Sequence, residues 1–218
     1  MRRLVSVLTI LLLATAAAAG AGDDIKWKRS KDLTFVVPGG EATTSCEFNE
    51  LARKYTLSWE NYRADEVYAV EATYIGWDVV YTVLSISLAG GIIDEDEFNN
   101  ELENERERFR NNIIFTVSVL ADSDKHARLS NRLYWEVYLA DGGKKIPAAE
   151  IEFSESAFEE ALLRALYEAG LGGLIIRSKK KYVVTFAKPY AGSVPTSLKL
   201  VVLCDDCRRG FEWRFKQD

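Results

Sequence analysis

Cys204-Asp205-Asp206-Cys207 is the sharpest chemical feature of this sequence. A redox-active pair of this spacing places its first cysteine at a helix N-terminus, where the helix dipole lowers the thiol pKa. Here the motif lies between two predicted strands, and the two carboxylates between the thiols disfavour a thiolate. We therefore expect a local Cys204–Cys207 disulfide across a hairpin turn, with Cys46 paired to one of them as the alternative.

A zinc site is the second interpretation of these cysteines. Cys46, Cys204, Cys207 and His126 are all the soft metal ligands in the chain, and together they would make a Cys3His set. No second closely spaced pair supports it, so we expect no metal and no other cofactor. His126 would also have to serve any Ser-His-Asp or Cys-His catalysis, but a single histidine in a polar stretch between strands is typical of a solvated side chain.

An acidic segment holds eight carboxylates between Asp94 and Glu107. It does not fit an EF-hand, because Phe98 stands at the fifth ligand position and Asn99 at the position that needs glycine. Acidic residues come first and arginines last, which suits a helix dipole. We expect a solvated helix face, and secondarily a docking surface that includes Asp94, Asp96, Glu97 and Glu101.

Four tryptophans divide into two pairs. Trp135 and Trp213 fall in the buried phase of alternating strands, which predicts core positions. Trp59 and Trp77 lie outside the clearest strands and could line a groove for a glycan or a peptide, so we add them to the candidate partner surface. Core or rim packing is the alternative for this second pair.

Common catalytic motifs are missing from the sequence. It contains no Gly-x-Ser-x-Gly elbow, no His-Glu-x-x-His and no phosphate-binding Gly-Lys-Ser/Thr. We assign no catalytic residue and favour a protein that is not an enzyme. A pair of carboxylates for glycan hydrolysis stays open, because only the distance between two such groups identifies them.

Residues 1–22 have the pattern of a secretory signal peptide. Met1-Arg2-Arg3 is basic, Leu4 to Leu13 is mostly apolar, and Ala14 to Gly22 consists almost entirely of small residues. The apolar run is shorter than the roughly 20 residues of a membrane span, although an uncleaved anchor is the alternative. The chain lacks any Asn-x-Ser/Thr acceptor, which favours a bacterial envelope. We expect a periplasmic or secreted protein.

The net charge of the mature chain limits the classes of partner that it can bind. Residues 23–218 keep 26 basic and 33 acidic residues, a net charge of −7. This charge argues against nucleic acid and against anionic lipid, and it also serves solubility. We expect a single exported domain with no stable membrane insertion after signal cleavage, while the oligomeric state stays open.

Period-two alternation of apolar and polar residues predicts several strands. We place them at 33–37, 55–59, 66–74, 113–119, 133–139, 182–186, 198–203 and 211–215. Turn-like segments between them indicate antiparallel pairing. The predicted fold is mostly β (α+β): an antiparallel immunoglobulin-like β-sandwich with two or three inserted helices.

The helical insertions are expected near 77–110 and 154–169. Asp94 with Glu97 resembles a capping box at the start of a helix that ends near Arg110. The segment 77–88 fits either a strand or a helix, and we favour a helix because Gly90 can end it.

The sequence favours an exported, non-enzymatic envelope protein that acts as a protein-binding, scaffold or accessory module. Its expected partner is another envelope protein. The alternatives are a carboxylate-based, glycan-active hydrolase and a module that binds a glycan or small ligand in a pocket lined by Trp59 or Trp77.

Overall fold

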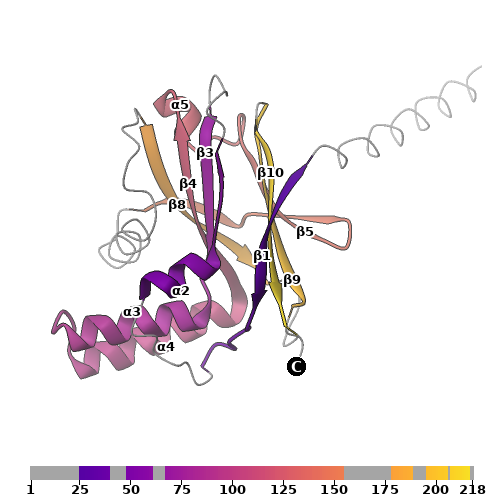
Figure 1. Cartoon of the computed structure of the whole chain (residues 1–218). Helices are drawn as coiled ribbons and strands as arrows, with labels where there is room; N and C mark the ends of the chain where they lie inside the picture. The colour runs from indigo at the N-terminus through magenta and orange to yellow at the C-terminus, as the bar shows by residue number, and fades with distance from the viewer. Residues whose placement is uncertain are drawn as a thin grey trace, which may run out of the picture.

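The computed structural model describes residues 25–39, 48–60, 67–154, 178–188, 195–205 and 207–216. Over these ranges the protein is mostly β, with two sheets and few helices (Figure 1). The predicted signal peptide, Cys46 and nearly all of the predicted helix at 154–169 lie outside the described residues. Within the described ranges, every helix is too short or too polar to span a bilayer.

The first sheet has five strands in the order β1-β10-β9-β5-β6. Its strands are β1 (Lys26–Leu33), β5 (Glu136–Asp141), β6 (Lys144–Pro147), β9 (Ser197–Leu203) and β10 (Arg208–Phe215). Most neighbours are antiparallel, as predicted, but β1 pairs with β10 in parallel. These two strands come from opposite ends of the chain, so no hairpin fixes their relative direction.

The second sheet also has five strands, in the order β2-β3-β4-β8-β7. Its strands are β2 (Thr56–Glu60), β3 (Val67–Tyr74), β4 (Asn112–Ala121), β7 (Glu150–Phe153) and β8 (Ser178–Ala187). All four pairings are antiparallel. β4 lies at the centre of the sheet and is buried along nearly its whole length.

One apolar core joins the two sheets. The rings of Phe115 on β4 and Trp213 on β10 have centroids 5.0 Å apart, and those of Tyr74 on β3 and Phe215 on β10 are 5.7 Å apart. Trp135 and Trp213 are buried, which confirms the core positions predicted for them. Aromatic rings from both sheets therefore provide much of the apolar area removed from water.

Four helices complete the described fold: α2 (Phe48–Tyr55), α3 (Trp77–Ala89), α4 (Glu95–Asn111) and α5 (Asp124–Ala127). The segment predicted as a helical insertion at 77–110 contains α3 and α4. The helical interpretation of 77–88 is confirmed, with Gly90 as C-cap and Gly91 at φ 65°. Helices α2, α3 and α4 gather at one end of the sheets and α5 lies at the other (Figure 1).

The strand predicted at 133–139 begins three residues late. Leu133 is fully exposed and not inward-facing, and β5 starts at Glu136. The reason is local, because the carbonyl of Asn131 accepts hydrogen bonds from the backbone N–H groups of Tyr134 and Trp135 at 3.0 and 2.8 Å. These bonds close a turn before the strand can begin.

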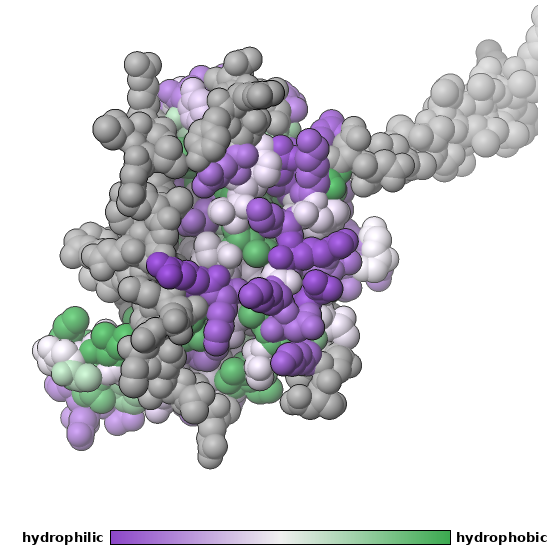
Figure 2. Space-filling view, in the orientation of Figure 1, coloured by the Kyte–Doolittle hydropathy of each residue, from purple (hydrophilic) through white to green (hydrophobic). Residues whose placement is uncertain are grey.

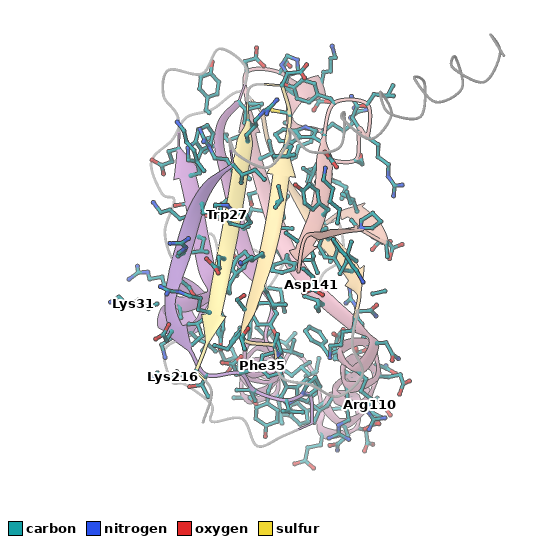
Figure 3. The ribbon with its side chains drawn as sticks, turned by 90° about the vertical axis from the view of Figure 1, so that its right-hand side faces the viewer. Trp27, Lys31, Phe35, Arg110, Asp141 and Lys216 are labelled. Atoms are coloured by element: carbon teal, nitrogen blue, oxygen red, sulfur yellow. The ribbon has the colours of Figure 1, made fainter. Side chains whose placement is uncertain are left out.

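The strand predicted at 33–37 is also displaced. The strand is β1, which ends at Leu33, while Phe35 and Val36 pack against the core as irregular chain. β1 is an edge strand with an outer face rich in basic residues, and Lys31 points away from the sheet (Figure 3). Charged edge residues of this kind discourage pairing with other chains and hide the alternating pattern.

Four short elements were not predicted, namely α2, α5, β6 and β7. The hairpin between β5 and β6 is closed by Gly142 and Gly143, at φ 52° and 85°. Two successive residues with positive φ are the requirement of the type I′ turn that suits a two-residue hairpin loop. The other predicted strands agree with the structure to within a few residues.

Candidate functional site

The start of α4 is fixed by a reciprocal pair of hydrogen bonds. Asp94 Oδ1 accepts from the backbone N–H of Glu97 at 2.8 Å, and Glu97 Oε2 accepts from the backbone N–H of Asp94 at 3.3 Å. This is the capping box that the sequence predicted, with aspartate in place of serine or threonine. It leaves the acidic side chains of the first turn at the surface.

Aromatic pairs hold α4 against α3. Trp77 at the start of α3 meets Phe109 at the end of α4, with ring centroids 6.4 Å apart, and Tyr81 meets Phe98 at 6.2 Å. Leu102 of α4 also packs against the core cluster, together with Phe98, and Phe109 belongs to that cluster. The two helices therefore form one packed unit, which we call the α3–α4 hairpin (residues 77–111).

The tip of this hairpin combines exposed apolar and acidic side chains. Ile86, in the last turn of α3, is 50% exposed, and Ile92, in the connection between the two helices, is 74% exposed. Apolar side chains gather at this projecting end in the space-filling view (Figure 2). Asp94, Asp96, Glu97 and Glu101 follow directly and are exposed, so four of the six predicted partner-surface residues share one region.

The charge of the hairpin is unbalanced along its length. Residues 77–105 include eight carboxylates and neither lysine nor arginine. Near the end of α4, Arg106 pairs with Glu103, Arg108 with Glu105 at 3.3 Å, and Arg110 with Glu107 at 3.5 Å. The negative potential is therefore strongest at the tip.

The other two residues of the predicted surface lie elsewhere. Trp77 is 2% exposed at the base of the hairpin. Trp59 lies on β2, where the guanidinium carbon of Arg209 sits 3.5 Å from its ring centroid. Burial lowers the pKa of Arg209, although the nearby Cys204 and Cys207 act in the opposite direction. The four acidic residues therefore lie in one region of the structure, and neither Trp59 nor Trp77 lies with them.

Cys204 and Cys207 face each other across the turn between β9 and β10. The N–H of Cys204 donates to the carbonyl of Cys207 at 2.7 Å, and the reverse bond is 3.2 Å. Both side chains are buried. No three metal-binding side chains gather among the described residues, and Cys46 lies outside them.

His126 is a packed residue, in contrast to the solvated loop histidine that we expected. Its Nδ1 lies 2.8 Å from Asp122 Oδ1, its ring stacks on Tyr134 with centroids 4.8 Å apart, and its side chain is only 14% exposed. The hydrogen bond with His126 lowers the pKa of Asp122. The carbonyl of His126 also accepts from Trp135 Nε1 at 3.0 Å, so these contacts anchor α5 to the start of β5.

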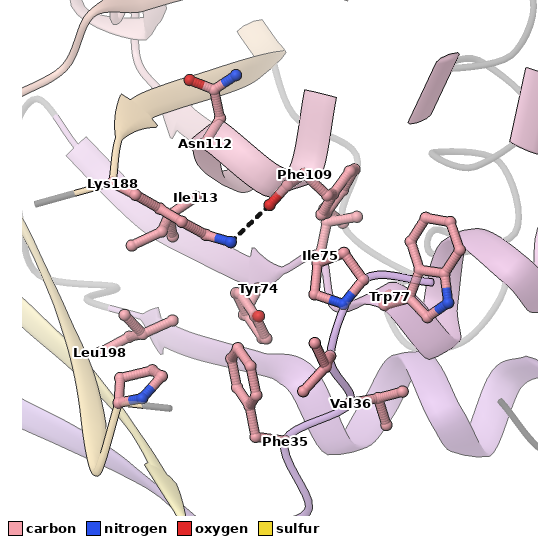
Figure 4. Close-up of a pocket in the computed structure, with 13 residues that line it drawn as sticks. Phe35, Val36, Tyr74, Ile75, Trp77, Phe109, Asn112, Ile113, Lys188 and Leu198 are labelled. Atoms are coloured by element: carbon pink, nitrogen blue, oxygen red, sulfur yellow. Dashed lines mark hydrogen bonds between the residues drawn. The ribbon is translucent and has the colours of Figure 1, made fainter. Parts of the chain in front are cut away.

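A cavity of about 80 Å³ lies between the base of the hairpin and the ends of both sheets (Figure 4). Its walls are mostly apolar and include Phe35, Val36, Trp77, Phe109 and Leu198, and none of the described residues that line it is a carboxylate. Lys188 also lines it, and its Nζ donates to the backbone carbonyl of Phe109 at 2.6 Å. Lys188 was not identified from the sequence, because it belongs to no motif and its lowered pKa results only from its partial burial in the fold.

The fold class is established at a coarse level: a mostly β, α+β protein with two sheets. No protein-family model matches the sequence, and no curated protein matches it. Among solved structures, the protein is similar to a novel protein of unknown function from Burkholderia pseudomallei K96243, with 12% identity and a TM-score of 0.40. That match covers 76% of this chain and 80% of the other.

Proposed function

We propose that the protein is an exported, non-enzymatic envelope module that binds a partner protein through the tip of the α3–α4 hairpin. The observation that carries this proposal is the exposure of Ile86 and Ile92 on a projecting hairpin. A group of exposed apolar side chains with a polar border is typical of a contact surface. Here the border consists of the acidic first turn of α4.

The chemistry of the tip defines the partner that it fits. The two isoleucines fit a small apolar depression, and the carboxylates from Asp94 onward fit a rim of lysine or arginine. Interface cores are depleted in charge while their rims are polar. Opposite charges at the rim would mainly raise the association rate and select the partner.

The base of the hairpin supports a rigid presentation of this surface. Trp77 and Phe109 lie in the core cluster, and Tyr55 on α2 donates a hydrogen bond to Asp78 in the first turn of α3. A hairpin held at its base loses little conformational freedom on binding, which benefits affinity.

The proposal also includes the finer fold and the location. Two facing five-stranded sheets support an elaborated immunoglobulin-like sandwich, with β1 added in parallel and the hairpin inserted between β3 and β4. The charge pattern of residues 1–22 supports export to a periplasm or to the medium.

The test compares two exposed apolar sites at different positions, and the control site, Leu133, is the more exposed of the two. Ile86→Asp/Ile92→Asp alters the tip, and Leu133→Asp alters an exposed leucine near α5, at the other end of the sheets. After in-cell cross-linking and affinity purification, we expect one reproducible envelope protein with the wild type and with Leu133→Asp. Its recovery should fall at least about tenfold with the tip variant, as for a loss of about 1.4 kcal/mol. Equal recovery with all three proteins, or no partner above background, would refute the proposal.

A further inference from the structure

The cavity at the base of the hairpin has one feature that packing alone does not require. Lys188 follows β8 and is partly buried, with its side chain among apolar residues of which Phe109, Ile113 and Leu198 form part of the wall. An ammonium ion taken out of water costs free energy unless charge or hydrogen bonds compensate it. Burial accordingly lowers the pKa of Lys188.

The compensation that the described residues provide is incomplete. The Nζ of Lys188 donates to the carbonyl of Phe109, which lies in the last turn of α4, where the helix dipole favours a cation. An ammonium has three N–H donors, and this bond uses one of them. Among the described residues no carboxylate forms an ion pair with Lys188.

We propose that this cavity binds a small monocarboxylate with a short, branched apolar tail, and that Lys188 pairs with the carboxylate. A bound carboxylate would supply the missing negative charge and accept the remaining N–H bonds. The apolar wall would take the tail. This inference goes beyond the protein-binding function proposed for the tip.

The volume limits the size of the ligand. An apolar cavity of about 150 Å³ holds benzene, so about 80 Å³ corresponds to roughly half of that molecule. The cavity would therefore take only the tail of three or four carbon atoms, while the carboxylate would lie beside the ammonium group of the partly exposed Lys188. Val37 is 55% exposed at the edge of the cavity, which gives the ligand a route from solvent.

Isovalerate is the probe, and its neutral amide is the matched control ligand. The full mature chain would be titrated while two-dimensional NMR follows the indole N–H signals of its five tryptophans. Trp77 lines the cavity, whereas Trp27 and Trp59 do not. We expect isovalerate to shift the Trp77 signal selectively and isovaleramide to bind at least about tenfold more weakly, since the amide lacks the charge.

Lys188→Met tests the role of the ammonium, because it keeps most of the side-chain volume and removes the charge. Lys31→Met, on the exposed face of β1, is the matched control. We expect a native-like spectrum for both variants, at least about tenfold weaker isovalerate binding for Lys188→Met, and no change for Lys31→Met. Equal binding of acid and amide, unchanged binding by Lys188→Met, or no shift of Trp77 at saturating isovalerate would each overturn the proposal.

Discussion

Tyr55 Oη donates a 2.6 Å hydrogen bond to Asp78 Oδ2, and this buried contact joins α2 to the first turn of α3. The backbone carbonyl of the same tyrosine accepts from Trp213 Nε1 at 2.6 Å. Tyr55 therefore connects the base of the hairpin with β10 of the opposite sheet. Burial raises the pKa of Asp78, and it also raises the pKa of Tyr55.

Tyr55→Phe should lower the free energy of unfolding by about 1–3 kcal/mol, because it removes the side-chain donor to a buried carboxylate and leaves it with backbone N–H donors only. The loss should depend on pH. A carboxyl whose folded-state pKa is raised stabilises the protein less as pH rises from its unfolded pKa through its folded pKa. Losing the phenol raises the pKa of Asp78 further, so chemical denaturation should show a greater loss near neutral pH than near pH 4.

Asp78→Asn serves as the control for this pH dependence. The asparagine side chain does not ionise, so Tyr55→Phe in that background should cost the same free energy at both pH values. A pH-dependent loss in the Asp78→Asn background would show that another group is responsible.

Gly210→Ala should weaken the attachment of β1 to β10. A Cβ at this position would lie 2.4 Å from Cε3 of Trp27, so the indole must move. We expect a cost of about 1–3 kcal/mol in unfolding free energy, as for other overpacked sites. In a Trp27→Ala background the same substitution should cost little, and equal costs in both backgrounds would contradict this explanation.

Asp94→Ala should loosen the first turn of α4. It removes the acceptor for the N–H of Glu97, and the loss of such a cap typically costs about 1 kcal/mol. Amide hydrogen exchange at Glu97 should become faster. Asp96→Ala removes an equal charge from the same turn without touching the cap, so similar exchange rates for both variants would contradict the capping role.

In the exported state that we propose, the protein should contain one disulfide and no zinc. The reciprocal backbone bonds make Cys204 and Cys207 a directly opposed pair, for which a Cα separation of about 5.5 Å is typical, and disulfides span this distance. The closed loop is short, so the stabilisation should be small. Intact-mass analysis after alkylation tests this prediction, and three alkylated cysteines or stoichiometric zinc would contradict it.

The core strands could be predicted because their alternation reflects one buried face. Phe115 and Trp213 follow that rule, and the helix at 77–88 was identified by its spacing and by Gly90. This rule did not predict β1, because β1 is a basic edge strand that is stabilised by main-chain pairing with β10, a distant segment of the chain. The same rule wrongly placed Leu133 in a strand. Backbone hydrogen bonds to the carbonyl of Asn131 close a turn there, and the alternation of apolar residues does not reveal such bonds.

The candidate sites were predictable to different degrees. The acids at the start of α4 were found because a capping box and a charge run are local signals. Lys188 and Arg209 were not, since each acquires its properties from partners that are remote in the sequence: Phe109 for Lys188 and Trp59 for Arg209. Burial of a cation depends on the tertiary fold, which no short motif records.

The most direct test of the central claim is site-specific photo-cross-linking in the cell. A benzophenone amino acid would replace Ile92 at the hairpin tip in one strain and the more exposed Leu133 in another. The account predicts a discrete cross-linked envelope protein from position 92 and none from position 133. No product at position 92, or the same product at both positions, would contradict the assignment of the α3–α4 hairpin as the binding surface.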